Sequence, residues 1–384
     1  GLNVYAQVGL TGNMEIAGSA NADNILGGSG ADNIDAGNGN NTVNSGGGND
    51  VVNSGIGADT IDGGSGNNTI NSGAGNDSVT TGDGNDSIMA GEGNDVISAG
   101  AGNDTVIAGD GNDSVSGGAG NDSIQGGNGD DRIYGEAGND SIDAGAGTSD
   151  RIAYNQTGGE AITATITSIG GITGVNAATV STATQGTDNI QGFEILIGSN
   201  IGDSITVTSA ATQNTNLFLF GGCGNDTIID NYRQNGVFAE YFTTSTSQTS
   251  GISVNLATGV ATDGFGGTDS LVGVTAINGT SFADTLLGGT GNDRFRGGQG
   301  NDSLDGGAGT SDMVDYANLA ASQAVSVNLA SGRANDGQGG TDTLISIEQV
   351  RGSAGNDTII GDGVDNIFRG NAGSDSLDGG AGTG

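Results

Sequence analysis

The sequence has no proline, histidine, tryptophan or lysine, and one cysteine in 384 residues. Without histidine or lysine the usual nucleophile–base pairs are missing, which argues against most enzymatic mechanisms. Eight cationic residues, all arginine, face 45 carboxylates, so the formal charge is −37. Because no basic patch can form, a nucleic-acid partner is disfavoured. No apolar run approaches the length of a membrane span.

Large side chains are also scarce. Hydrophobic residues make up 33% of the chain and aromatic residues 4%, which places it near the disordered regime of low hydrophobicity and high charge. The single cysteine, Cys223, cannot form an internal disulfide, and we interpret it as a small side chain on an exposed loop. Neither disulfides nor a large core can therefore order this chain.

Glycine is abundant, with 80 residues, and much of it belongs to a nine-residue repeat spanning residues 18–143. The run from Gly117 to Gln125 reads Gly-Gly-Ala-Gly-Asn-Asp-Ser-Ile-Gln. Position 4 is glycine at all fourteen places from Gly30 to Gly147, and position 8 is always isoleucine or valine. Position 6 is occupied by Asp23, Asp32, Asn41, Asp50, Asp59, Asn68, Asp77, Asp86, Asp95, Asp104, Asp113, Asp122, Asp131 and Asp140.

Each repeat divides into a glycine-rich loop and a short strand. The apolar residue at position 8 can point inward while its two neighbours point outward, because side chains alternate along a strand. We expect a left-handed backbone angle at the invariant position 4, which only glycine adopts freely. Position 1 accepts alanine, serine and threonine, so its backbone should be ordinary. Nearly every aspartate is explained by the repeat, which leaves little for catalytic carboxylate pairs.

This G-G-x-G-x-D-x-U-x pattern resembles the repeat-in-toxin (RTX) family of secreted calcium-binding proteins. The resemblance implies an all-β fold, a right-handed parallel β-roll with two repeats per coil, in which loops eighteen residues apart stack. Position-6 side chains then form two columns, one beginning at Asp23 and one at Asp32. Ca²⁺ between stacked loops would bind carboxylates and backbone carbonyls, as a hard cation prefers. Asn41 and Asn68 predict one weakened place in each column.

The implied calcium ligands extend beyond the long block. Further side-chain ligands are expected at Asp203, Asp226, Asp284, Asp293, Asp302, Asp357 and Asp375. Backbone carbonyl ligands are expected at loop glycines such as Gly28, Gly30, Gly46, Gly48, Gly82, Gly84, Gly100, Gly102, Gly118 and Gly120. We expect on the order of one ion per stacked loop, and a core this small makes the ion part of the fold.

Recurring signatures divide the chain into repeat blocks and spacers. A Gly-Ser or Gly-Thr start signature precedes Asp23, Asp203, Asp284 and Asp357, and Gly-Thr-Ser-Asp end signatures close two blocks. The predicted segments are N-terminal strands at 1–17, a long roll at 18–150, a spacer at 151–195, a short block at 196–231, a spacer at 232–276, a roll at 277–316, a spacer at 317–349 and a last roll at 350–384. The last block stops within a third end signature, so we interpret the sequence as part of a longer modular polypeptide.

Nine of the fifteen aromatic residues fall between Phe193 and Phe282, among them Phe218, Phe220, Phe238, Tyr241 and Phe242. The favoured interpretation is the core of a β-sandwich-like spacer, and the alternative is a sticky patch for a partner subunit or a polysaccharide. Each spacer is expected to cap one roll and start the next, continuing the solenoid.

Two functions fit these features. The favoured one is a non-enzymatic extracellular structural protein, a component of a surface layer, filament or adhesin that calcium folds and stiffens after secretion. Its partners would be calcium, further copies of itself or other cell-surface components. The alternative is the C-terminal repeat region of a secreted enzyme or toxin whose catalytic domain lies outside this chain. Either protein would be bacterial and exported unfolded by type I secretion.

Overall fold

The computed structural model describes residues 3–5, 12–155, 160–169, 174–210, 216–232, 236–241 and 248–382. The chain divides into two compact units, Gly1–Ser199 and Asn200–Gly384. Within the described ranges the regular structure is β-strand, apart from one 3-10 turn, η1 (Leu329–Ser331). No helix in these ranges has the length and apolar character needed to cross a membrane.

The first unit consists of two sheets that the chain visits in alternation. Sheet I contains β2 (Glu15–Ala17), β4 (Asn33–Asp35), β6 (Val51–Asn53), β8 (Thr69–Ala74), β10 (Ser87–Glu92), β12 (Thr105–Asp110), β14 (Ser123–Asn128), β16 (Ser141–Ala146), β18 (Thr163–Ile169), β19 (Val175–Ser181) and β20 (Thr187–Gln191). Sheet II contains β1 (Asn3–Tyr5), β3 (Asn24–Gly28), β5 (Thr42–Gly46), β7 (Thr60–Asp62), β9 (Ser78–Thr80), β11 (Val96–Ser98), β13 (Ser114–Ala119), β15 (Arg132–Ala137), β17 (Arg151–Ala153) and β21 (Ile195–Ile197).

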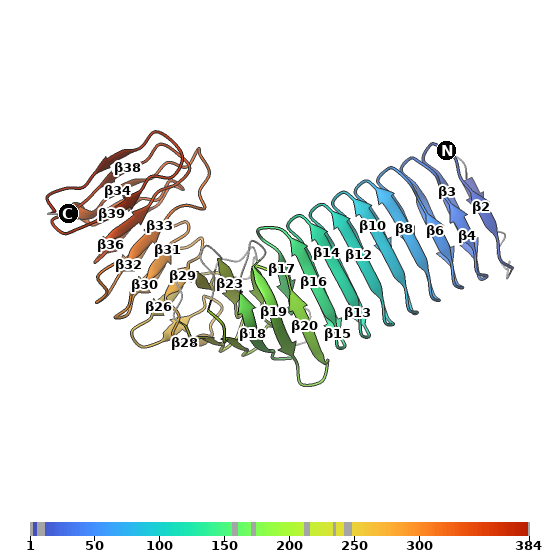
Figure 1. Cartoon of the computed structure of the whole chain (residues 1–384), viewed down its shortest axis with the longest axis horizontal. Helices are drawn as coiled ribbons and strands as arrows, with labels where there is room; N and C mark the ends of the chain where they lie inside the picture. The colour runs from blue at the N-terminus through green and yellow to red at the C-terminus, as the bar shows by residue number, and fades with distance from the viewer. Residues whose placement is uncertain are drawn as a thin grey trace. The chain divides into compact units, whose positions relative to one another are not determined.

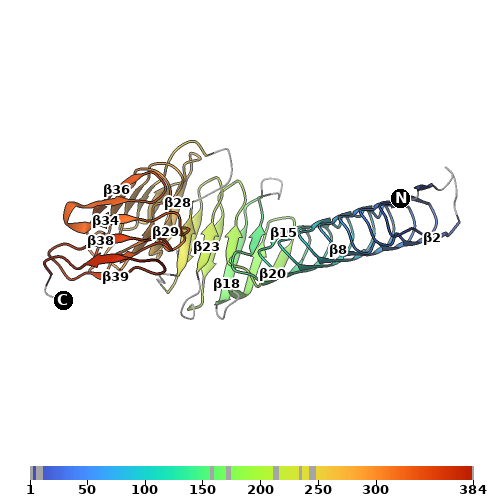
Figure 2. The same ribbon diagram turned by 90° about the horizontal axis from the view of Figure 1, so that it is seen from above.

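Strands in each sheet pair in parallel with the strand one coil away. Ile88 of β10 is opposite Val106 of β12, and Ile97 of β11 is opposite Val115 of β13, so one coil is eighteen residues, two repeats. Figure 1 shows the strands of this unit side by side like rungs, and Figure 2 shows the coils from above. The predicted parallel β-roll with two repeats per coil is confirmed.

The core of the roll is one apolar residue wide. All fourteen position-8 isoleucine and valine side chains are buried, as the strand alternation predicts. Position-1 side chains such as Ala90 and Ala99 also point inward and are fully buried. Position 6 completes the inward set, so buried carboxylates lie at the ends of a thin hydrophobic interior.

Two loop positions have backbone angles that favour glycine. The predicted left-handed angle at position 4 is confirmed at twelve of the fourteen places, for example φ 143° at Gly102, whereas Gly30 and Gly147 do not have it. Position 2 also has it, with φ 96° at Gly100, which the sequence did not indicate because Glu136 stands there at φ 70°. Gly117, at position 1, is not among the left-handed glycines.

The first spacer extends both sheets. In sheet I, β20 pairs in parallel with β16, while β18 and β19 add an antiparallel hairpin beside it. In sheet II, β17 pairs with β15 and β21 pairs with β17. Within this unit the solenoid therefore continues through the spacer, as expected.

The second unit repeats the two-sheet plan. Its sheet I contains β22 (Ser204–Val207), β24 (Thr227–Asp230), β26 (Ser253–Asn255), β27 (Val260–Thr262), β28 (Thr268–Val272), β30 (Thr285–Leu287), β32 (Ser303–Asp305), β34 (Ser326–Asn328), β35 (Arg333–Asn335), β36 (Thr341–Ile345), β38 (Thr358–Ile360) and β40 (Ser376–Asp378). Its sheet II contains β23 (Leu217–Phe220), β25 (Val237–Glu240), β29 (Ala276–Asn278), β31 (Arg294–Arg296), β33 (Met313–Asp315), β37 (Gln349–Arg351) and β39 (Ile367–Arg369).

Spacer strands of the second unit are also rungs of these sheets, and not a separate sandwich. β28 pairs in parallel with β24, and β36 with β32, while β27 and β35 lie antiparallel beside them. Pairing of Ser204 with Thr227 joins the two halves of the short block across the inserted segment. The two spacers match strand for strand, and both contain a Ser-Val-Asn strand, at Ser253–Asn255 and Ser326–Asn328.

The aromatic cluster is buried only in part, and Phe218, Phe220 and Phe265 are half-buried. Phe193, Phe238 and Tyr241 lie in the interior, and the rings of Phe218 and Phe238 stack with centroids 5.1 Å apart. Arg294 and Arg296 lie over the Phe238 ring, both 4.7 Å from its centroid. Asp315 forms ion pairs with both arginines, at 2.5 and 2.9 Å. Tyr232 and Phe282 are exposed, and Phe242 lies outside the described residues.

Candidate metal centre

The position-6 carboxylates link each loop to the next loop on the same edge. The backbone N–H of Asp77 donates to Oδ1 of Asp95 at 2.7 Å, and that of Asp95 donates to Oδ1 of Asp113 at 2.8 Å. The same bond recurs along both columns, at Asp23–Asn41, Asp32–Asp50, Asn41–Asp59, Asp50–Asn68, Asp59–Asp77, Asn68–Asp86, Asp86–Asp104, Asp104–Asp122, Asp113–Asp131 and Asp122–Asp140. The predicted columns therefore exist, and each carboxylate commits one oxygen to stacking.

The second oxygen of most of these carboxylates is buried without a hydrogen-bond partner. This holds for Oδ2 of Asp50, Asp59, Asp77, Asp86, Asp95, Asp104, Asp113, Asp122, Asp131 and Asp140. Where position 1 carries a hydroxyl, that hydroxyl donates elsewhere: Thr81 Oγ1 bonds the Ala99 carbonyl at 2.6 Å. A buried carboxylate oxygen with no donor is costly unless a cation or a proton satisfies it.

The pKa values of the column aspartates agree with the need for a cation or a proton at Oδ2. Burial raises the pKa of Asp95 to about 7. The hydrogen bond from the Asp77 backbone lowers this pKa, whereas the negative charges of Asp113 and Asp77 raise it further. Burial likewise raises the pKa of Asp131 and Asp140 to about 7. Ionised carboxylates are thus unfavourable in the bare loops, and a divalent cation between them would reverse the balance.

Backbone carbonyls approach the gap between stacked loops. A methyl group built at Gly102 would lie 1.8 Å from the Gly84 carbonyl oxygen, and one at Gly120 would lie 1.7 Å from that of Gly102. The position-4 carbonyls thus face the next loop. Position-2 carbonyls already accept a backbone bond, as Gly82 does from Ala101 at 2.9 Å. They keep one lone pair for a cation.

The two asparagines of the columns form hydrogen bonds with neighbouring protein groups through both their Oδ1 and Nδ2 atoms. Oδ1 of Asn41 accepts the Asp23 N–H at 2.9 Å, while its Nδ2 donates to the Gly37 and Ser54 carbonyls, both at 3.1 Å. The amide thus keeps the stacking bond, leaves no free oxygen and occupies a loop carbonyl. This geometry supplies a physical reason for the weakened place predicted there.

The first aspartate of three blocks differs from those inside the columns. Ser19 donates its N–H to Oδ2 and its hydroxyl to Oδ1 of Asp23, at 2.5 and 3.0 Å. Thr280 donates the same two hydrogen bonds, from its N–H and its hydroxyl, to Asp284, and Ser353 donates them to Asp357. The start signature therefore caps the outermost carboxylate by hydrogen bonds.

The remaining sequence-predicted residues occupy comparable places. Asp203 donates its N–H to Oδ1 of Asp226 at 2.8 Å, and Asp357 donates to Oδ1 of Asp375 at 3.0 Å. Asp284 donates to Asp302 at 2.9 Å. Oδ2 is buried and unpartnered in Asp226 and Asp302, whereas Oδ2 of Asp293 accepts the Gly289 N–H at 2.6 Å.

Sequence reasoning missed that both columns continue into the spacers. Asp131 donates to Asp150, Asp140 to Asp188, Asp226 to Asp269, Asp293 to Asp312 and Asp302 to Asp342, at 2.7 to 3.1 Å. Glu194 and Glu348 then accept the N–H groups of Asp150 and Asp312. The signal was present in the end signature and in a Gly-Thr-Asp triplet that each spacer contains, at residues 186–188, 267–269 and 340–342. The aspartates of both were left out of the ligand set.

Three spacer aspartates have their second oxygen occupied by tyrosine. Tyr154 donates to Oδ2 of Asp188 at 2.8 Å, Tyr241 to Asp269 at 2.9 Å and Tyr316 to Asp342 at 3.1 Å. All six side chains are buried. At the spacers, the tyrosine hydroxyl thus supplies the hydrogen-bond partner for Oδ2 that the interior carboxylates lack.

Position 5 provides a second, outer ladder that the sequence analysis did not identify. The N–H of Asn103 donates to Oδ1 of Asn85 at 2.8 Å, and that of Asn121 to Oδ1 of Asn103 at 2.7 Å. These asparagines lie on the exposed side of the loops. They support the stacking without any charge.

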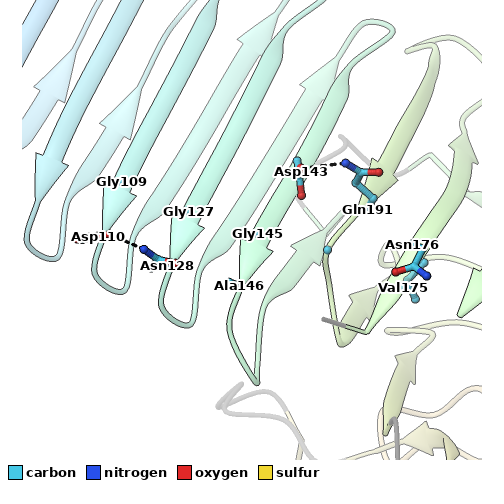
Figure 3. A pocket seen from close by; sticks show the side chains of 11 residues that line it. Gly109, Asp110, Gly127, Asn128, Asp143, Gly145, Ala146, Val175, Asn176 and Gln191 are labelled. Atoms are coloured by element: carbon cyan, nitrogen blue, oxygen red, sulfur yellow. Dashed lines mark hydrogen bonds between the residues drawn. The ribbon is translucent and has the colours of Figure 1, made fainter. Parts of the chain in front are cut away.

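A groove of about 550 Å³, shown in Figure 3, is lined mainly by glycine and amide groups, and Asn128 and Gln191 donate there to Asp110 and Asp143. The thiol of Cys223 is half-buried, and burial followed by the charges of Asp263 and Asp226 raises its pKa. A protonated thiol is a poor nucleophile.

The described residues contain no compact cluster of three or more acidic, histidine or cysteine side chains able to hold a metal. The loops instead offer one inward carboxylate each, with carbonyls from the neighbouring loop. Such a donor set, made only of oxygens, suits Ca²⁺.

The comparison with protein families agrees with the geometry. The model of the RTX calcium-binding nonapeptide repeat matches residues 17–52, 45–79, 53–88, 80–115, 116–149, 278–312 and 351–384, more than half of the chain. No curated protein matches the chain. No catalytic family is found beside the repeats, which are typical of secreted bacterial proteins. The chain belongs to the family of RTX calcium-binding nonapeptide repeat proteins.

Proposed function

We propose that this chain is an extracellular structural protein, a component of a bacterial surface layer, filament or adhesin, which Ca²⁺ folds and stiffens after secretion. The observation that carries the proposal is the row of buried, unpartnered Oδ2 atoms along both columns. An ion between stacked loops would satisfy the Oδ2 of a position-6 carboxylate and adjacent position-4 carbonyls. The interior aspartates from Asp50 to Asp140 are the ligands with the strongest support.

The metal would supply the missing stabilisation. The roll buries one isoleucine or valine per repeat, so its hydrophobic core is thin. With no ion the buried carboxylates oppose folding, whereas a bound ion adds stability that grows with its concentration. Such a chain would remain unfolded at low cytoplasmic calcium, pass through a type I secretion channel and fold outside the cell.

Circular dichroism tests the folding switch. In excess chelator the chain should be largely unordered, and millimolar Ca²⁺ should restore the β signal. Mg²⁺ at equal concentration should do so poorly, because it demands a smaller octahedral site. Sodium chloride at matched ionic strength controls for simple screening of the charge of −37. A full β spectrum in chelator would overturn the proposal.

Self-assembly distinguishes a structural role from the alternative, in which the chain is a folding and secretion region of an enzyme or toxin. The long ladders and the lack of a catalytic family favour the structural role. Purified chain with Ca²⁺ should form sheets or filaments visible by electron microscopy and disperse in chelator. Folded chain that stays monomeric at every concentration would favour the alternative.

A further inference from the structure

The last loop of a column has a shortage of free carboxylate oxygens. Asp269 uses Oδ1 to accept the Asp226 N–H and Oδ2 to accept the Tyr241 hydroxyl. An ion between the loops 221–226 and 264–269 would therefore meet only one free position-6 oxygen, Oδ2 of Asp226. Interior ions would meet one from each loop.

An additional aspartate begins the spacer loop at this place. Oδ1 of Asp263 accepts the N–H groups of Phe265 and Gly267, both at 2.8 Å, which closes a tight turn. Its Oδ2 is buried and has no hydrogen-bond partner, and the residue is 1% exposed. A methyl group at Gly267 would lie 2.4 Å from this Oδ2 and 1.7 Å from the Gly224 carbonyl oxygen. The two oxygens thus converge on one point beside the preceding loop.

The third spacer repeats this arrangement. Oδ1 of Asp336 accepts from Gln338 and Gly340, at 2.7 and 2.8 Å, and its Oδ2 is buried without a partner. A methyl group at Gly340 would lie 2.5 Å from that Oδ2 and 1.6 Å from the Gly300 carbonyl oxygen. The adjacent column residue, Asp302, also has a free buried Oδ2.

We propose that Asp263 and Asp336 are additional calcium ligands, each completing an ion site with a column carboxylate and a position-4 carbonyl of the preceding loop. The donors are Asp263, Asp226 and Gly224 in one site and Asp336, Asp302 and Gly300 in the other. Each site has two carboxylates, which is consistent with the lack of larger acidic clusters among the described residues. The inference rests on the proposed calcium-dependent fold and adds a spacer residue to it.

Burial and charge support the pairing. Burial, with repulsion from Asp269, Asp203 and Asp263, raises the pKa of Asp226 to about 7 against the effect of its backbone bond. Two buried carboxylates whose charges repel each other favour a shared divalent cation over two separate charges.

Two comparisons within the chain show that the turn does not require an aspartate, and that an aspartate at this place need not be buried. The first spacer makes the same turn, with the Thr182 N–H bonding the Gly186 carbonyl at 3.1 Å, but threonine offers no charge there. In a regular repeat Asp62 precedes the loop in the same sequence place, yet it lies exposed. Among the described residues, the carboxylate at this place is buried at Asp263 and Asp336.

The test uses the whole chain with Asp263→Asn and Asp336→Asn, singly and together. Asparagine keeps Oδ1 for the turn and removes the charge. Calcium binding is measured by equilibrium dialysis and calorimetry, with circular dichroism as the check on folding. The double variant should lose two ions or bind them at least about tenfold more weakly, since ligand charge sets calcium affinity. Asp62→Asn, with the same charge change on an exposed residue, should bind like the wild type.

Equal ion counts and affinities in the double variant and Asp62→Asn would overturn the inference while leaving the proposed function intact. A wild-type chain that binds no calcium would overturn both. Thr182→Asp provides a test that does not depend on losing a site. It adds a carboxylate beside Asp140, whose Oδ2 is free, and should strengthen one site in the first unit by about tenfold. Unchanged calcium binding in Thr182→Asp would count against the inference.

Discussion

Replacing Asp95 by asparagine tests whether interior carboxylates act through calcium. Asp95 lies in the middle of its column, accepts the Asp77 N–H through Oδ1 and has a free, buried Oδ2. Asparagine keeps the Oδ1 acceptor, and its Nδ2 can donate within its own loop, as that of Asn41 does to Gly37. The stacking geometry should therefore survive, and the change isolates the loss of one charged ligand.

The magnitude follows from linkage. A central carboxylate lies between two stacked gaps, so its loss affects up to two ions. At a free Ca²⁺ concentration ten times the dissociation constant, each ion contributes about 1.4 kcal/mol to the free energy of unfolding, so the variant should lose up to about 2.8 kcal/mol. Asp95→Ala should lose about 1–3 kcal/mol more, because the buried Asp77 N–H is then left without an acceptor.

Thermal melting across a calcium titration is the assay. The deficit of Asp95→Asn relative to the wild type should grow with calcium concentration. As calcium is lowered it should vanish or reverse, because the bare Asp95 carboxylate is itself buried without a partner. Asp110→Asn, which removes an exposed carboxylate that bonds Asn128, is the matched control and should shift little at any concentration. A deficit in Asp95→Asn that is the same at all calcium concentrations would refute the role assigned to Oδ2.

Two further substitutions test the spacer and the loop. Tyr316→Phe leaves Oδ2 of Asp342 buried without its donor and should lower the free energy of unfolding by about 1–3 kcal/mol, measured by denaturation in saturating Ca²⁺; a loss below about 0.5 kcal/mol would contradict the tyrosine cap. Gly102→Ala places a methyl group 1.8 Å from a carbonyl oxygen at φ 143° and should cost more than about 2 kcal/mol. Ala99→Gly, at position 1, should cost only about 0.5–1 kcal/mol, and equal losses in these two variants would refute the positional argument.

The repeat period predicted most of the roll because its interactions are local and periodic. Position 8 alternates with polar neighbours, so burial of Ile88 follows from strand geometry. The invariant position 4 predicted the left-handed angle at Gly102. These features need only the sequence of a single repeat and its stacking on a copy of itself.

The spacers could not be predicted in this way, because their key contacts join residues that share no period. One inserted residue before Asp150 lengthens the step from Asp131 to 19, yet the column continues. Tyr154 bonds Asp188 across 34 positions, a pairing fixed only when β17 and β20 dock on the roll. The prediction of a separate β-sandwich in the spacers was wrong for the same reason. Alternating apolar runs indicate strands, but they do not indicate which sheet each strand joins.

In each interior aspartate the two carboxylate oxygens have different roles, one in loop stacking and one in the proposed metal binding. Oδ1 of each interior aspartate already fixes the eighteen-residue register through a backbone N–H, and the position-5 asparagines repeat that register on the outer side. Both ladders are made of the protein's own donors and acceptors. The register of the loops is thus encoded in the chain itself. Under the proposed function, Ca²⁺ removes the cost of the buried Oδ2 atoms and so decides whether the encoded structure is stable. A sequence built in this way can carry the complete information for its fold while remaining unfolded until the ion is present.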